Sequence, residues 1–327
     1  MEKQQTALPR TAPDRVRQKK SKLRYITPPV LQLYTVGVLT VGYFLDIDPV
    51  AQGGGTSFLP VLILELMAFV LPAIFFVKLQ PPSYYKRMHL RLFGAEKAVF
   101  VLFVSGFTVC ALTVLKLLLQ TVAGYLPNTR VLWGIPTPTI GFDPLDSAYT
   151  ILIFALIPAV VQCFYYRSVV FAYYEKYGKV TAVMCSAFLF ALTQFSAGDA
   201  LVHFLYGLIL AFAVCVTDSV FGAMIVHFVY CLYQIGLERY IWSFVGKPDG
   251  MVFFVFVSVA LLLLFGALLA GEAERIVLAA GEDELPEQSS APQNRQSGWR
   301  VLVSRFVHPA MLICIAVYAA ASFLIQL

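Results

Sequence analysis

The chain has 327 residues, of which 59% are hydrophobic and 13% charged, with a net charge of +5 and a mean hydropathy of +0.76. These values exclude a soluble globular domain, and the modest net charge gives no indication of a nucleic-acid partner. Apolar runs of roughly 20 residues, enough to cross a hydrocarbon core of about 30 Å, recur along the chain. Because these runs are apolar throughout and do not alternate with polar residues, the sequence predicts an all-α, polytopic transmembrane helical bundle.

Residues 1–28 form a basic segment that is expected to lie in the cytoplasm. Residues 29–146 are expected to contain the N-terminal transmembrane spans, at 30–45, 58–77 and 98–119. The connection between the second and third of these spans is rich in Lys and Arg, which indicates a cytoplasmic loop. No cleavage site of small residues follows the first apolar run, so we interpret that run as an uncleaved span.

Residues 147–244 form the predicted core transmembrane domain, with four more apolar runs at 147–166, 181–196, 201–216 and 220–238. A further span is predicted within 245–271, an acidic cytoplasmic linker at 272–300 and a last span at 301–327, which brings the total to eight to nine spans. Most basic residues fall on the side assigned to the cytoplasm, in agreement with an N-terminus inside. The lack of an organelle signal or lipidation motif favours a bacterial cytoplasmic membrane.

Three polar clusters, at residues 162–167, 190–194 and 227–231, interrupt the apolar runs of the core. Polar groups at membrane depth are costly unless they are satisfied, so these clusters are the candidates for function. Residues four apart share one face of a helix. Three pairs have this spacing: Cys163 and Arg167, Phe190 and Gln194, and His227 and Cys231. Three helices are thus predicted to offer polar side chains to a common interior, as in the metal sites of helical bundles.

Residues 162–194 resemble the core of the CPBP (Abi) family of intramembrane metalloproteases, which includes the CAAX prenyl endopeptidases. Proteins of that family carry Glu-Glu-x-x-x-Arg, then Phe-x-x-x-His, then His-x-x-x-Asn or a close variant. The spacing of the first two motifs matches without a gap, and Arg167, Phe190 and His227 stand as in the family pattern. The resemblance covers about 80 residues, and the other spans add nothing to it.

The sequence departs from this pattern at four positions. Gln162 and Cys163 replace the two glutamates, Gln194 replaces the middle histidine, and Cys231 replaces the asparagine. The resemblance implies that the first glutamate activates a water held by the histidines. An amide has no titratable proton near neutral pH, so Gln162 cannot act as a general base. The amide oxygen of Gln194 is also a much poorer zinc ligand than an imidazole.

The leading interpretation is a catalytically degenerate homologue without a cofactor. Its partners are expected to be the lipid bilayer and a membrane-embedded or lipidated peptide or protein, which it binds or scaffolds. The former site is then packed by amides, thiols and the rings of Tyr165, Tyr166 and Tyr230. Whether the chain is an enzyme is left open, because the family is proteolytic while the base and one ligand are replaced.

Two alternatives remain. One is an active intramembrane metallo-endopeptidase, CAAX-type or bacteriocin-processing, with zinc on Cys163, His227 and Cys231, which are residue types that zinc prefers. The other is a proton-coupled carrier that uses Glu65, a carboxylate within the second predicted span. A structural pair of Glu65 with Lys116, or a protonated Glu65 beside a snorkelling Lys116, is the simpler interpretation of that carboxylate.

Overall fold

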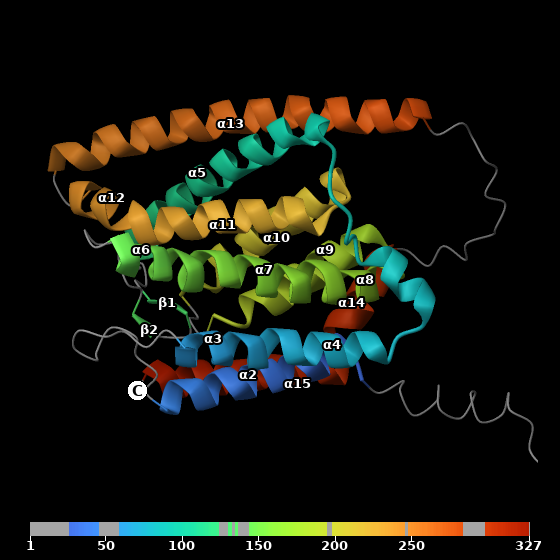
Figure 1. Cartoon of the computed structure of the whole chain (residues 1–327). Coiled ribbons are helices and arrows are strands. Elements are labelled where there is room, and N and C mark those ends of the chain that lie inside the picture. Colours follow the sequence, from blue (N-terminus) through green and yellow to red (C-terminus); the bar gives the residue numbers. More distant parts are fainter. Residues whose placement is uncertain are drawn as a thin grey trace, which may run out of the picture.

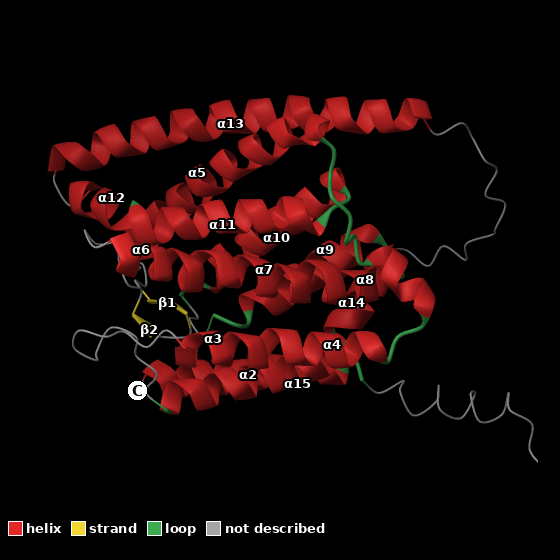
Figure 2. Cartoon of the chain, in the orientation of Figure 1, coloured by secondary structure: helices red, strands yellow, loops and turns green. Residues whose placement is uncertain are grey.

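The structure, a computed structural model, describes residues 26–45, 59–123, 130–132, 135–136, 144–194, 198–245, 248–283 and 298–326. Within these ranges the regular structure is helical except for a short antiparallel pair of strands, β1 (Arg130–Leu132) and β2 (Ile135–Pro136) (Figure 2). The predicted all-α bundle is therefore confirmed. Residues 1–25 of the predicted basic segment lie outside the described part of the chain.

The N-terminal part consists of apolar helices joined by a short basic connection. Its elements are α2 (Pro28–Phe44), α3 (Leu59–Glu65), the π-helical turn η2 (Leu66–Val70), α4 (Leu71–Lys78), the 3₁₀ turns η3 (Pro82–Arg87) and η4 (Ala95–Lys97), and α5 (Ala98–Ala123). α2 begins at Pro28 because proline presets the helical φ angle in the first turn, where its missing N–H has no helical partner to lose. Thr27 before it is extended, as residues preceding proline prefer.

The C-terminal part holds the core and the last helices. Its elements are α6 (Pro144–Ile151), η5 (Leu152–Leu156), α7 (Ile157–Cys163), η6 (Phe164–Val170), α8 (Phe171–Glu175), α9 (Lys179–Ala191), α10 (Ala200–Thr217), α11 (Val220–Gly236), α12 (Glu238–Val245), α13 (Pro248–Asp283), α14 (Gly298–Phe306) and α15 (Pro309–Gln326). α13 continues past residue 272, where the acidic linker was predicted to begin. Residues 284–297 of that linker lie outside the described ranges.

The helices form layers, with α13 along α5 at one edge and α2 against α15 at the opposite edge (Figure 1). Between these edges lie α11, α10, α9 and the helical segment from α6 to α8. α11 contacts α5, α10 and α7, and is therefore central to the bundle. The buried side chains form one continuous hydrophobic core that extends from α2 to α15.

Two π-helical turns each precede a proline inside an apolar helix. η2 ends at Val70, just before Pro72, and η5 ends at Leu156, just before Pro158. Proline lacks an N–H, and its ring crowds the carbonyl four residues earlier, so a wider turn accommodates it without ending the helix. The segment Pro144–Glu175 therefore runs on as one long helical span and carries Gln162 to the middle of the bundle.

A close approach of backbones joins α9 to α10. A Cβ atom added to Gly207 of α10 would lie 2.9 Å from the Cα atom of Ala187 in α9. Small residues at such contacts let membrane helices pack by van der Waals attraction, since lipid gives no hydrophobic drive for association. Gly207 therefore sets the spacing between two of the helices that surround the polar residues.

Five helical segments are long and apolar enough to cross a membrane: Leu59–Lys78, Ala95–Val122, Pro144–Glu175, Ala200–Thr217 and Gly250–Ala279. Two bent pairs raise the number to seven, with bends of 52° between α11 and α12 and 50° between α14 and α15. The predicted eight to nine spans are thus not confirmed within the described residues. The predicted spans at 30–45 and 181–196 fall on α2 and α9, which have only 17 and 13 residues.

Candidate functional site

The polar residues of the predicted core meet where α7 ends and η6 begins, facing the middle of α11. Gln162 and Cys163 close α7, Arg167 lies in the π-helical turn η6, and His227 and Cys231 lie on α11. Each of the five side chains is buried, with 4% exposure or less. The motif spacing therefore predicted correctly that these residues share one interior.

Cys163 and His227 are in direct contact. The Sγ atom of Cys163 lies 3.5 Å from Nδ1 of His227, across the packed pair α7 and α11. Cys231, one helical turn after His227, lies within electrostatic range of Cys163. Among the described residues, however, no group of three His, Cys, Asp or Glu side chains is arranged to hold a metal ion. The zinc set of Cys163, His227 and Cys231 therefore stays a prediction. Within this set, Cys163 and His227 are the pair in direct contact.

Gln194 does not occupy the helical position that the sequence predicted. α9 ends at Ala191. In the turn that follows, the Leu192 N–H donates to the Phe188 carbonyl at 3.2 Å, and the Thr193 N–H donates to the Phe190 carbonyl at 3.1 Å. Gln194 follows in the bend and is only half-buried. The predicted shared face of Phe190 and Gln194 is thus wrong, because the helix stops before it reaches Gln194.

Arg167 is fully buried, and its guanidinium is only partly satisfied. Nη1 donates to Ser186 Oγ at 2.9 Å, and the guanidinium carbon lies 5.3 Å from the ring centre of Phe190. Both partners are on α9, so Arg167 ties η6 to that helix. Nε and Nη2 have no hydrogen-bond partner within the described chain. A buried cation with two free donors is costly, which makes it a position where a ligand can be bound.

Glu65 is a site residue that sequence reasoning placed incorrectly. It ends α3, is fully buried, and lies against the side chain of Gln162, because α3 packs on α7. It is also within electrostatic range of Cys231. Neither carboxyl oxygen forms a hydrogen bond of ordinary geometry with any described residue. In the sequence, Glu65 stands out as a single carboxylate in an apolar run. This pattern does not show which helix the Glu65 side chain faces.

The expected pairing of Glu65 with Lys116 is wrong. Lys116 Nζ lies 2.5 Å from Glu238 Oε1, at the junction of α11 and α12, and both side chains are largely buried. Trp242 Nε1 donates to the same Glu238 oxygen at 3.3 Å. Asp199, which precedes α10, lies close to this pair, and burial raises the pKa of its carboxyl to about 6 even though Lys116 opposes the shift.

Tyrosine rings pack around the central residues. Tyr165 and Tyr166 are in edge contact at 4.7 Å, and Tyr206 lies 4.6 Å from Tyr230 and 5.3 Å from His227. The prediction that Tyr165, Tyr166 and Tyr230 fill the interior is confirmed, since none exposes more than 1%. No sequence motif predicted Tyr206 as a residue of this site. Such aromatic pairs add about 0.5–1.5 kcal/mol each beyond burial.

Residues 144–233 match a family model described as type II CAAX prenyl endopeptidase, Rce1-like. The matched stretch runs from α6 into α11 and includes Gln162, Cys163, Arg167, His227 and Cys231. Comparisons with curated proteins and with solved structures gave no match. The family match confirms the resemblance that the motifs indicated over this stretch. The long apolar helices identify the chain as an integral membrane protein.

Proposed function

We propose that this CAAX-protease-like membrane protein is a catalytically inactive homologue that binds a membrane-embedded or lipidated peptide or protein. Loss of catalysis follows from Gln162, because its amide cannot accept a proton near neutral pH at the position where the family has its general base. The protein then uses the interior of the core for recognition and holds or scaffolds its partner without cutting it.

The observation that carries the binding role is a pair of unsatisfied groups in the core. Arg167 offers two free donors, and Glu65 offers two acceptor oxygens, all without ordinary hydrogen bonds in the described chain. Leaving such groups buried and unpaired costs about 1–3 kcal/mol each, and more when they are charged. A peptide main chain supplies carbonyl acceptors for Arg167 and N–H donors for Glu65, so its binding would satisfy both.

A binding assay with a fluorescent prenylated peptide tests this proposal on the full chain in detergent. We expect saturable binding without cleavage, and at least tenfold weaker binding for Arg167→Gln, with Arg167→Lys intermediate. Arg239→Gln is the matched control, because Arg239 is exposed and lies outside the core. Cleavage that disappears in His227→Ala would contradict an inactive protein, and equal affinity in Arg167→Gln would contradict the binding role.

A second candidate, an active zinc endopeptidase, is favoured by one distance. Two atoms bound to one tetrahedral zinc through about 2.3 Å (sulfur) and 2.0–2.1 Å (nitrogen) lie about 3.5 Å apart. Cys163 Sγ and His227 Nδ1 have this separation, and Cys231 would be the third ligand. Glu65, beside Gln162, would then supply the carboxylate base that the motif lacks.

The metal content of the purified protein separates the two candidates. The zinc endopeptidase requires about one zinc per chain, which His227→Ala removes and Glu65→Gln retains while cleavage is lost. The inactive homologue is expected to contain no stoichiometric zinc. The carrier alternative is tested in the same variants, because substrate flux through a carrier would end in Glu65→Gln and survive in His227→Ala.

We also infer that the chain lies in a bacterial cytoplasmic membrane with its N-terminus inside. The support is the basic connection between α4 and α5, which holds Lys86, Arg87, Arg91 and Lys97. Short loops on the cytoplasmic side carry such an excess of Lys and Arg. A reporter protein that is active only in the cytoplasm is therefore expected to be active when it is fused near residue 90.

A further inference from the structure

A second candidate site lies at the end of the bundle that carries the basic connection, away from the core residues. A half-open pocket of about 1330 Å³ is lined by this connection, α8, the end of α10, the start of α9 and the later turns of α13. Its volume exceeds the roughly 300–1,000 Å³ typical of small-molecule sites. The pocket can therefore hold a polar headgroup together with the beginning of an acyl chain.

The wall of the pocket carries an excess of positive charge. Six Lys or Arg side chains line it, against three Asp or Glu side chains. Arg91, Lys97 and Arg275 are engaged, with Asp218, with the Thr217 carbonyl and with Glu272, respectively. Lys86, Arg87 and Lys179 have no ion pair or hydrogen bond with any described residue, and are free for a ligand.

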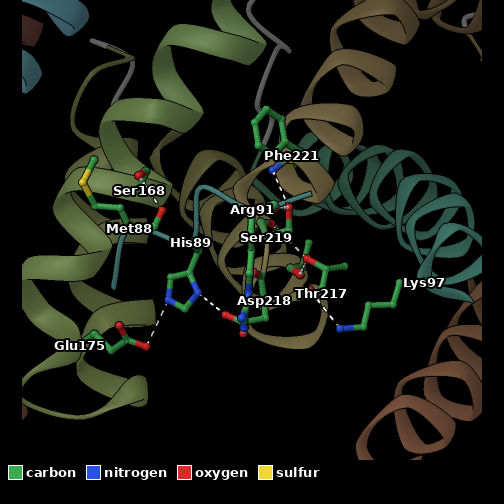
Figure 3. Close-up of polar contacts among 11 residues, drawn as sticks. Met88, His89, Arg91, Lys97, Ser168, Glu175, Thr217, Asp218, Ser219 and Phe221 are labelled. Atoms are coloured by element: carbon green, nitrogen blue, oxygen red, sulfur yellow. Dashed lines mark hydrogen bonds and ion pairs between the residues drawn. The ribbon is translucent and has the colours of Figure 1, made fainter. Parts of the chain in front are cut away.

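The loop of residues 88–91, which forms part of the pocket wall, is held in a defined shape (Figure 3). His89 lies between Glu175 and Asp218, with Nε2 3.2 Å from the Glu175 carboxylate and Nδ1 in contact with the Asp218 carboxylate. His89 and Asp218 both have positive φ, at 52° and 55°, a conformation that costs non-glycine residues about 1–2 kcal/mol. Contacts on both sides stabilise this conformation.

Backbone contacts fix the loop further. The Val220 N–H donates to the His89 carbonyl at 3.0 Å, and Ser168 Oγ donates to the Met88 carbonyl at 2.7 Å. Ser219 Oγ donates to the Arg91 carbonyl (Figure 3). The loop is thus pinned to both η6 and the α10–α11 turn, so the part of the pocket wall that follows Lys86 and Arg87 in the chain is preorganised.

We propose that this pocket binds a phosphate-bearing anion through Lys86, Arg87 and Lys179. Lys and Arg donors form short, charge-assisted hydrogen bonds with phosphate oxygens. Basic pockets between membrane helices on the cytoplasmic side bind the headgroups of anionic lipids. Phe171, Ile276 and Val277 add an apolar part to the wall, which suits a lipid source for the phosphate. The proposed anion binding does not depend on whether the residues of the core catalyse a reaction.

Native mass spectrometry of the full chain tests the proposal, with phosphatidic acid and phosphatidylcholine as lipid probes and inorganic phosphate as the soluble probe. We expect selective retention of phosphatidic acid. The triple variant Lys86→Ala/Arg87→Ala/Lys179→Ala is expected to bind it at least tenfold more weakly, and Lys179→Gln alone severalfold more weakly. Raising the salt concentration should weaken binding, because salt screens exposed charges.

The matched control is Lys78→Ala/Arg239→Ala/Arg300→Ala, which removes the same charge from three exposed positions outside the pocket. It is expected to bind within twofold of the unmodified protein. Retention of phosphatidic acid without competition by millimolar inorganic phosphate assigns the site to lipid headgroups, whereas competition assigns it to soluble phosphates as well. Equal losses in the two triple variants, or no preference over phosphatidylcholine, would overturn the proposal.

Discussion

The thiol of Cys163 contacts the imidazole of His227 at 3.5 Å, and this contact joins α7 to α11 at the centre of the bundle. Both residues are buried, with exposures of 1% and 3%. Packing of this kind protects a cysteine, because the thiolate that reacts with electrophiles is disfavoured away from water. The same pair would supply two of the three ligands in the predicted zinc set, which stays a prediction.

We first predict that Cys163 resists alkylation in the folded protein while the half-buried Cys215 reacts. His227→Ala removes the ring that covers the thiol and should speed alkylation of Cys163 at least tenfold. Tyr206→Phe is the control, since it removes only the weak 3.4 Å bond from the hydroxyl to the His227 carbonyl. Peptide mapping after timed N-ethylmaleimide treatment gives the rates. Fast labelling of Cys163 in the unmodified protein would contradict the burial of this thiol between α7 and α11.

A second prediction concerns Glu65. Replacing its carboxyl with an amide in Glu65→Gln should leave thermal stability in detergent unchanged or raise it by about 1 kcal/mol, because a neutral amide costs less to bury than a carboxylate. The amide can also pair with Gln162 beside it. Thermal unfolding of the two proteins side by side measures the difference. A large loss of stability would show that the carboxylate is held by a cation or a metal in the folded protein.

In contrast to Glu65→Gln, substitutions in the ion pair of Lys116 and Glu238 are expected to lower stability. Lys116→Met and Glu238→Gln each leave one largely buried charge without its partner, and each is expected to cost about 3–5 kcal/mol. The double variant should cost less than the sum of the two. A double-mutant cycle on unfolding midpoints measures this coupling, and strict additivity would argue against the pair.

Close packing of α9 and α10 predicts a strong effect at Gly207. In Gly207→Ala the new methyl meets the Ala187 backbone at 2.9 Å, so the helices must move apart, at an expected cost of about 1–3 kcal/mol. The control is Gly37→Ala in α2, where a Cβ meets nothing within 4 Å and alanine favours the helix. Gly37→Ala should be neutral or stabilising. Similar effects at both positions would contradict the close approach.

The raised pKa of Asp199, about 6 against an ordinary 3.8, predicts a pH-dependent effect of Asp199→Asn. The folded state binds the proton more tightly than the unfolded state, so ionised Asp199 lowers stability above about pH 6. This penalty fades as the pH falls through 6 towards 4. Asp199→Asn should therefore be more stable than the unmodified protein at pH 7.5, by about 2–3 kcal/mol. The difference should approach zero near pH 4, and unfolding midpoints across this range will show whether it does.

The sequence predicted the convergence of Gln162, Cys163, Arg167, His227 and Cys231, because their motif spacing and helical periodicity are local properties. It failed at Gln194, since no residue type at 191–194 signals that α9 ends there. The contact between Glu65 and Gln162 depends on the packing of α3 against α7, which are far apart in the chain. The count of eight to nine spans is not confirmed within the described residues, because α2 and α9 have only 17 and 13 residues, and hydropathy alone does not show where these helices end.

The length of α13 has a consequence for the bilayer itself. Its 36 residues extend about 54 Å at 1.5 Å per residue, whereas the hydrocarbon core is only about 30 Å thick. The helix must tilt or project beyond the lipid tails, and Arg275, which donates to the Glu96 carbonyl across the pocket, lies in its last turns. Membrane thickness therefore enters the geometry of this contact: a thicker bilayer draws α13 upright, and a thinner one tilts it.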